Sequence, residues 1–170
     1  MNILETERLI LREFTLTDAP FIYELLNSPG WLKNIGQRGI SGLKEAGKYI
    51  THLIIPSYEK YGFGFYLMEK KADNASIGMC GLIKRDSLED VDIGFAILPQ
   101  YEGQGYTTEA ALATMDYAKD SLGLKRIAAI TVPYNPGSIS ILKKLGMKHE
   151  KIIRLPNDDE DLMFFTIDHN

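Results

Sequence analysis

Cysteine is almost absent from this chain, which has one, Cys80, among 170 residues. An intramolecular disulfide is therefore impossible, and a reducing compartment fits this composition. Cys80 stands between Met79 and Gly81 in a strand-like stretch. That setting favours a small buried hydrophobic residue over a reactive nucleophile.

Histidine is also scarce, and the three histidines, His52, His149 and His169, lie far apart in the sequence. None has a serine, a cysteine or a second metal-ligating residue at a spacing that catalytic or zinc motifs use. We therefore expect no metal site and no histidine-based catalytic group.

Long apolar runs are missing as well: no run approaches the ~20 residues that a membrane span needs. The first 14 residues alternate charged and aliphatic side chains, unlike the apolar core of a signal peptide. The net charge of −4 argues against a general nucleic-acid surface, so backbone amides would have to hold an anionic ligand. These absences predict a soluble, cytoplasmic protein without membrane or nucleic-acid partners.

The remaining composition, 45% hydrophobic and 25% charged, is that of an ordinary globular protein. We expect a single domain over residues 1–170. The patterns predict strands at residues 8–14, 63–69, 76–84, 92–98, 126–132, 147–154 and 162–167. They predict helices at residues 17–27, 41–55, 106–121 and 135–145, with the second helix stopping near Pro56 and an irregular segment at 28–42. A strand–helix–strand unit over residues 92–132 predicts a parallel pair in an otherwise hairpin-built sheet, hence a mixed α/β fold with helices on the sheet faces.

The segment from Asp92 to Ala110 is the most informative part of the chain. One face of its strand is large and aliphatic, and the other begins with a carboxylate and two small residues, Asp92, Gly94 and Ala96. A helix packed on the small face explains this pattern, and so does a ligand that lies along it. Both interpretations stay open at this point.

A tight turn with Gly103 and Gly105 follows this strand and leads into a helix pattern. Such a turn can hold an anion on the unpaired N–H groups of the first helical turn. No Gly-Lys-Ser/Thr follows, so it is not a P-loop, and the third glycine of a dinucleotide fingerprint is missing.

The sequence Asn135-Pro136-Gly137-Ser138 begins the last helix pattern. Asparagine is a favoured N-cap and proline is favoured directly after it, so a helix start explains these residues fully. Their polar groups could also meet a ligand.

Three segments together resemble the GNAT superfamily of N-acetyltransferases, in its branch of ribosomal-protein N-terminal acetyltransferases (RimJ/RimL-like). Residues 99–110 resemble its acetyl-CoA pyrophosphate loop, and residues 135–147 resemble its next motif. The opening residues 5–12, Glu-Thr-Glu-Arg-Leu-Ile-Leu-Arg, are typical of this branch. The motifs occur in the family's order and cover nearly the whole chain.

This resemblance implies a twisted, mostly antiparallel sheet of six or seven strands, splayed at its one parallel pair. Acetyl-CoA, as the cosubstrate, would lie in the splay. The residues implied to contact it are Phe95, Ala96, Ile97 and Leu98 for the pantetheine arm, Glu102, Gly103, Gln104, Gly105, Tyr106 and Thr107 for the pyrophosphate, and Asn135 and Ser138 beside the arm.

Two positions depart from the family's pattern. The family's phosphate loop usually has Gln or Arg, or Trp in this branch, where this chain has Glu102, and Lys or Arg where it has Gln104. A carboxylate near a pyrophosphate weakens binding unless it points to solvent. Leu142 stands where many members place a tyrosine that acts as general acid. Ser138, a water held by Asn135, or Tyr134 would have to replace it.

The expected reaction is direct transfer of an acetyl group from acetyl-CoA to a primary amine. The amine is mostly protonated at pH 7 and needs a base, for which Asp92 is the first candidate, although a strand-end surface charge explains Asp92 as well. Trp31 and Arg38, outside the cofactor motifs, are candidates for acceptor binding. The alternative is a CoA-binding regulatory or interaction module without catalysis. The sequence is compatible with a monomer or a homodimer.

Overall fold

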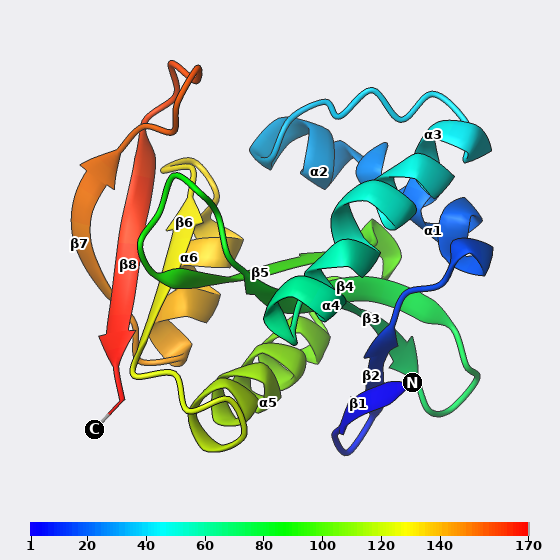
Figure 1. Cartoon of the computed structure of the whole chain (residues 1–170), viewed down its shortest axis with the longest axis horizontal. Coiled ribbons are helices and arrows are strands. Elements are labelled where there is room, and N and C mark those ends of the chain that lie inside the picture. The colour runs from blue at the N-terminus through cyan, green and yellow to red at the C-terminus, as the bar shows by residue number, and fades with distance from the viewer. Residues whose placement is uncertain (170) are drawn as a thin grey trace.

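The computed structural model describes residues 1–169, and over that range it has one eight-stranded sheet with helices on both faces (Figure 1). The strands are ordered β1-β2-β3-β4-β5-β6-β8-β7, and only β5 and β6 are parallel neighbours among these described elements. The strands are β1 (Asn2–Glu5), β2 (Leu9–Glu13), β3 (Phe65–Lys70), β4 (Ser76–Ile83), β5 (Val91–Ile97), β6 (Arg126–Thr131), β7 (Lys148–Ile153) and β8 (Leu162–Asp168). The α-helices are α1 (Ala19–Leu26), α2 (Pro29–Asn34), α3 (Leu43–Tyr49), α4 (Ile55–Tyr61), α5 (Tyr106–Asp120) and α6 (Pro136–Lys144).

The predicted mixed α/β fold is confirmed, but the sheet has eight strands rather than six or seven. The additional strand is β1, which pairs with β2 at the edge of the sheet. It has four residues, an irregular register between Asn2 and Leu4, and no fully buried side chain. So short and exposed an edge strand has little hydrophobic alternation to reveal it in the sequence.

The expectation that residues 28–42 are irregular was wrong in part, because α2 lies within them. Ser28 has an extended backbone and Pro29 occupies the first turn, which is the usual start of a helix. The helix has only six residues, and its Trp31 is 5% exposed. Tertiary burial of the indole therefore supports a helix that is too short to be stable alone.

The expected stop near Pro56 was also wrong. A π-helical segment, η2 (Ile50–Ile54), connects α3 to α4, so the helical path continues to Tyr61. Pro56 lies in the first turn of α4, where the missing N–H is tolerated. Gly62, with φ at +79°, ends α4 in the left-handed conformation that helix ends favour.

Two buried clusters lie on opposite faces of the sheet. One joins α5 and α6 to the strands through residues that include Ala110, Met115, Leu142 and Phe165. The other joins α1–α4 to the opposite face through residues that include Ile22, Leu25, Trp31, Ile50 and Leu98. The two helical layers hold the sheet from both sides (Figure 1).

The parallel pair in the middle of the sheet is short. Only Val91 with Ile127 and Asp92 with Ala128 are in register between β5 and β6, within the part of the chain described. Beyond Asp92 the two strands diverge, although β5 continues to Ile97 and β6 to Thr131. The predicted splay is therefore present, and it divides the sheet into a β1–β5 part and a β6–β8 part.

Candidate active site

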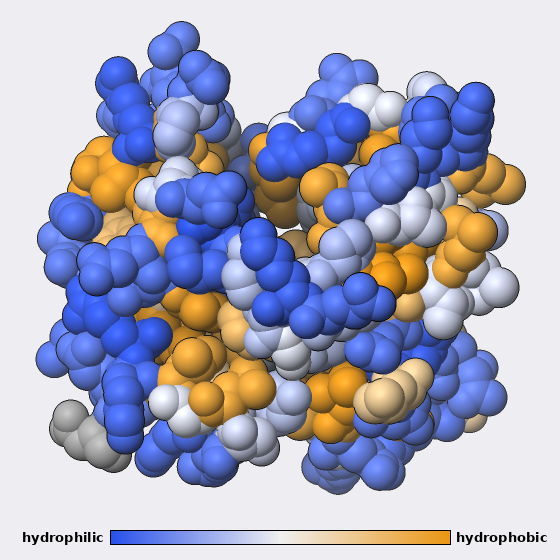
Figure 2. Space-filling view, in the orientation of Figure 1, coloured by the Kyte–Doolittle hydropathy of each residue, from blue (hydrophilic) through white to orange (hydrophobic). Residues whose placement is uncertain are grey.

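A cavity of about 1260 Å³ opens where β5 and β6 diverge. Its walls come from α2, α4, both diverging strands, the turn before α5 and the start of α6. Figure 2 shows the surface hollowed between the β6–β8 part and the α1–α4 part, with apolar residues in the walls. Most of the residues expected to bind substrates line this one cavity.

The turn between β5 and α5 has the predicted form. A short 3₁₀ turn, η3 (Pro99–Tyr101), precedes it, and Gly103 and Gly105 have φ of +74° and +81°. Gly105 is the residue directly before α5, so the first N–H groups of that helix start from a left-handed turn. The cavity is lined by Glu102, Gly103, Gly105, Tyr106 and Thr107.

Gln104 faces elsewhere: it is exposed, and its carbonyl accepts a hydrogen bond from Arg8 Nη1 at 3.0 Å. Arg8 also donates through Nε to Glu109 Oε1 at 2.8 Å, and its guanidinium carbon lies 4.1 Å from the centre of the Tyr106 ring. Glu109 Oε2 accepts from the backbone N–H of Arg8 and from the hydroxyl of Thr6. Thr6 and Arg8, near the start of the chain, thus hold the turn and the first turn of α5 in place through hydrogen bonds to Gln104 and Glu109.

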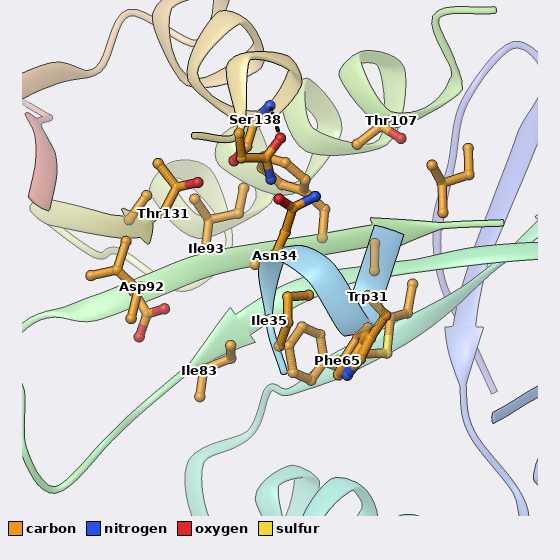
Figure 3. Close-up of a pocket in the computed structure, with 18 of the residues that line it drawn as sticks. Trp31, Asn34, Ile35, Phe65, Ile83, Asp92, Ile93, Thr107, Thr131 and Ser138 are labelled. Atoms are coloured by element: carbon orange, nitrogen blue, oxygen red, sulfur yellow. Dashed lines mark hydrogen bonds between the residues drawn. The ribbon is translucent and has the colours of Figure 1, made fainter. Parts of the chain in front are cut away.

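Asp92 is the last β5 residue in register with β6, and it is 1% exposed. Its carboxylate accepts a hydrogen bond from Arg85 Nε at 3.0 Å. Burial raises the pKa of Asp92 to about 6, while the positive charge of Arg85 acts in the opposite direction. Figure 3 shows Asp92 and Ile93 pointing to opposite sides of β5, with Asp92 on the side of Ile83.

Three of the four residues expected along the pantetheine arm, Phe95, Ala96 and Ile97, line the cavity beyond the last β5–β6 pair. Leu98 lies outside the lining and packs in the cluster below α1–α4. Its N–H donates to Ile77 O at 2.8 Å, and its carbonyl accepts from Tyr101 N–H at 3.0 Å. Its backbone groups are therefore already paired within the protein.

The start of α6 forms the opposite wall. Asn135 is the N-cap, as predicted, and its Oδ1 accepts from Ser138 N–H at 3.2 Å (Figure 3). Leu142 is 1% exposed in the same wall, so this position offers no acidic group. The hydroxyl of Tyr134 donates to Glu160, which raises the pKa of Tyr134.

Trp31 and Arg38 both line the cavity on the α2 side. Sequence reasoning missed three residues near them, Asn34, Tyr49 and Arg85. Arg85 could have been found from the hairpin of β4 and β5. Ile83, at the end of β4, pairs with Asp92, and Arg85 follows Ile83 by two residues in the connecting loop. Asn34 and Tyr49 had no signal, because only the tertiary packing of α2 and α3 brings them to the cavity.

The sequence raises two further kinds of group, clusters of metal-ligating side chains and the thiol of Cys80. Within 1–169, no group of three or more histidine, cysteine or acidic side chains is placed to hold a metal ion. Cys80 is fully buried, and burial raises its pKa to about 12. In the same range, no helix combines the length and apolar character needed to cross a bilayer.

Comparison with known proteins gives consistent matches. A family model described as an acetyltransferase (GNAT) domain matches residues 8–148. The N-acetyltransferase p20 of Bacillus licheniformis is 30% identical over 155 residues, covering 91% of this chain and 86% of that protein. The N-acetyltransferase YoaA of Bacillus subtilis (strain 168) is 29% identical over 154 residues, covering 89% and 86%.

Solved structures share the fold. An acetyltransferase from Agrobacterium tumefaciens str. C58 superposes with a TM-score of 0.84 at 24% identity, covering 99% of this chain and 95% of that one. RimL, a ribosomal L7/L12 alpha-N-protein acetyltransferase in complex with coenzyme A, gives a TM-score of 0.84 at 17% identity, covering 99% and 98%.

Proposed function

The chain belongs to the GNAT acetyltransferase family, and from that membership we propose that it uses acetyl-CoA to acetylate a primary amine by direct transfer. The observation that carries the proposal is the single cavity that joins the Gly103–Gly105 turn to the unpaired part of β5. One end of it offers backbone amides to phosphates, and the other offers a buried carboxylate.

The phosphate end suits the pyrophosphate of acetyl-CoA. The N–H groups of the turn and the first turn of α5 would receive it, with Arg8 holding the turn from behind. Glu102 is the unfavourable element, although its Oε1 is directed toward Gly30 of α2, 3.7 Å from where a β-carbon on that glycine would lie. Backbone groups of Phe95 to Ile97 would pair with the amides of the pantetheine arm.

Acetyl transfer would take place in the middle of the cavity. The amine nitrogen attacks the thioester carbonyl, a C–N bond forms, and the C–S bond breaks to release CoA. Asp92, directly or through a water, would take the proton from the amine, because its raised pKa suits a base near neutral pH. A β5 backbone N–H would stabilise the developing oxyanion, and Ser138 or a water on Asn135 would return a proton to the leaving thiolate.

Tyr134 is a weaker candidate for that acid. Its hydroxyl already donates to Glu160, and a proton shared with a carboxylate is harder to give away. We therefore favour Ser138 over Tyr134 as the acid that protonates the leaving thiolate.

A thiol-release assay tests this function. Acetyl-CoA is offered with a panel of amines: protein N-terminal peptides, amino acids, polyamines and aminoglycosides. N-terminal peptides belong in the panel because RimL, whose fold is similar, is an alpha-N-protein acetyltransferase. We expect CoA release that depends on one class of amine. CoA binding measured by calorimetry, with no turnover on any amine, would instead support a binding module.

A further inference from the structure

The α2 side of the cavity holds two polar atoms without partners. Among the described residues, neither Trp31 Nε1 nor Asn34 Oδ1 has a hydrogen-bond partner, and both atoms are shielded from water. The two residues are three apart on one short helix, and both line the cavity. Figure 3 shows the Asn34 amide on the side of Ser138 and the Trp31 ring on the side of Phe65. One atom can only donate and the other can only accept.

An unpaired buried polar atom costs about 1–3 kcal/mol, so two on one short helix call for an explanation. A ligand with an oxygen acceptor and an N–H donor would satisfy both. Figure 3 shows Asn34 extending into the middle of the cavity on the side of Ser138. An acceptor amine would therefore meet Asn34 between Asp92 and the α6 wall.

The cations around this end of the cavity differ in whether they have a partner within the protein. Arg85 is paired with Asp92, and Lys84 donates to two backbone carbonyls, those of Arg85 and Leu88. Arg38 is exposed, lines the cavity and forms no ion pair within residues 1–169. Arg38 is thus a cation in the cavity wall that has no ion-pair partner among the described residues.

The pKa of Tyr49 reports the effect of two of these charges. Burial raises its pKa, and the positive charges of Arg38 and Arg85 both oppose that rise. The phenol therefore lies within the electrostatic field of both guanidinium groups. Two guanidinium groups thus act on the Tyr49 phenol at this end of the cavity, and Arg85, but not Arg38, is paired with a carboxylate in the described residues.

We infer that the acceptor is a primary amine that also carries a carboxylate, which Arg38 and the Trp31 N–H bind while Asn34 Oδ1 faces the amine. This inference rests on the proposed acetyl transfer and narrows its substrate. A polyamine has no oxygen and would leave Trp31 and Arg38 unsatisfied, whereas an amino acid or an N-terminal peptide with an acidic side chain supplies both groups. A guanidinium binds a carboxylate through paired N–H donors.

The test compares matched acceptors in matched variants. Each acceptor is offered as the carboxylate and as the carboxamide, and kcat/KM is measured for the wild type, Arg38→Gln, Arg38→Lys and Lys48→Gln. Taking the carboxylate-to-carboxamide ratio in each protein, and comparing ratios between proteins, cancels any difference in amine pKa. Lys48→Gln is the control because Lys48 is an exposed cation on α3, beside Tyr49 but outside the cavity lining.

We expect Arg38→Gln to lower the ratio roughly 10- to 100-fold, the range for losing a hydrogen bond to a charged group. Arg38→Lys should restore part of it, and Lys48→Gln should leave it unchanged. Trp31→Phe, which keeps the ring and removes the N–H, should raise KM for the carboxylate acceptor more than for the carboxamide.

Two results would overturn the inference. Equal losses for carboxylate and carboxamide in Arg38→Gln would mean that Arg38 acts on structure, while acetyl transfer itself would stand. Free amino acids and acidic N-terminal peptides form separate arms, so the active arm identifies the source of the carboxylate. If no amine is acetylated by the wild type, the proposed function fails and the inference falls with it.

Discussion

At the residue scale, the most consequential group is the buried carboxylate of Asp92. A carboxylate that is 1% exposed is normally paired, and Asp92 is paired with Arg85 at 3.0 Å. Its pKa nevertheless rises to about 6, because the effect of burial exceeds that of Arg85. The pair can therefore serve as a structural anchor for the end of β5 or as a base near neutral pH, and pH dependence separates the two roles.

If Asp92 is the base, only its deprotonated form is active. The value of kcat/KM should then rise as pH increases through about 6 and level off above it. Asp92→Asn should abolish this rise and lower kcat roughly 10²- to 10⁴-fold, the range for general base catalysis, while calorimetry finds CoA affinity almost unchanged. Arg85→Gln should move the rise to higher pH, because the lost positive charge favoured the carboxylate.

A rise that stays at the same pH in Arg85→Gln would assign it to another group, such as the amine itself. Equal turnover in Asp92→Asn and the wild type would remove Asp92 from the chemistry and leave it the anchoring role.

Local signals in the sequence sufficed for some residues of this site. Gly103, Gly105 and Asn135 were predictable because a left-handed turn and an N-cap each favour few residue types. Asn34 and Arg8 were not, because their roles depend on contacts with residues far away in the chain. The bond from Arg8 to Glu109, for example, joins residues 101 positions apart.

At the element scale, the Gly103–Gly105 turn and α5 form one continuous unit. The turn depends on two left-handed glycines in front and on Arg8 behind. The pairing of β3 with β4 and of β5 with β6 followed from hairpin and crossover patterns. The position of β8 between β6 and β7 and the helical path through Pro56 did not. A proline in a first helical turn gives the same sequence signal as one that stops a helix.

Gly105→Val should abolish CoA binding in calorimetry, a loss of roughly 100-fold or more. The φ of +81° at Gly105 strains a β-branched residue, and a β-carbon there would lie 3.3 Å from Arg8 Nη2, so the turn and its brace would both move. The matched control is Gly123→Val, because Gly123 has a φ of +66° and no atom within 4 Å of its would-be β-carbon.

The control variant should lose stability from the same kind of backbone strain but keep its affinity for CoA. Intact CoA affinity in a folded Gly105→Val protein would contradict the assignment of the turn as the phosphate site.

At the scale of the whole molecule, all eight strands belong to one sheet, but few residues pair between the two central strands, β5 and β6. Six residue pairs join β4 to β5 and six join β6 to β8, whereas two join β5 to β6. The β1–β5 part and the β6–β8 part are thus held together mainly by helix packing and by the first two residues of β5. A ligand that fills the cavity would contact both parts at once, so its binding should stabilise the folded chain and protect the contacted part of β5.

We expect acetyl-CoA to raise the melting temperature and to slow amide hydrogen exchange in β5 beyond Asp92 and in residues 102–107. A ligand at 100 times its Kd stabilises the folded state by about 2.7 kcal/mol, enough for a shift of several degrees in a chain of this size. The β7 strand (Lys148–Ile153) serves as the internal reference, because it lies at the sheet edge and outside the cavity lining. Protection equal in β7 and β5 would indicate global stabilisation alone, and protection absent from β5 would place the ligand outside the splay.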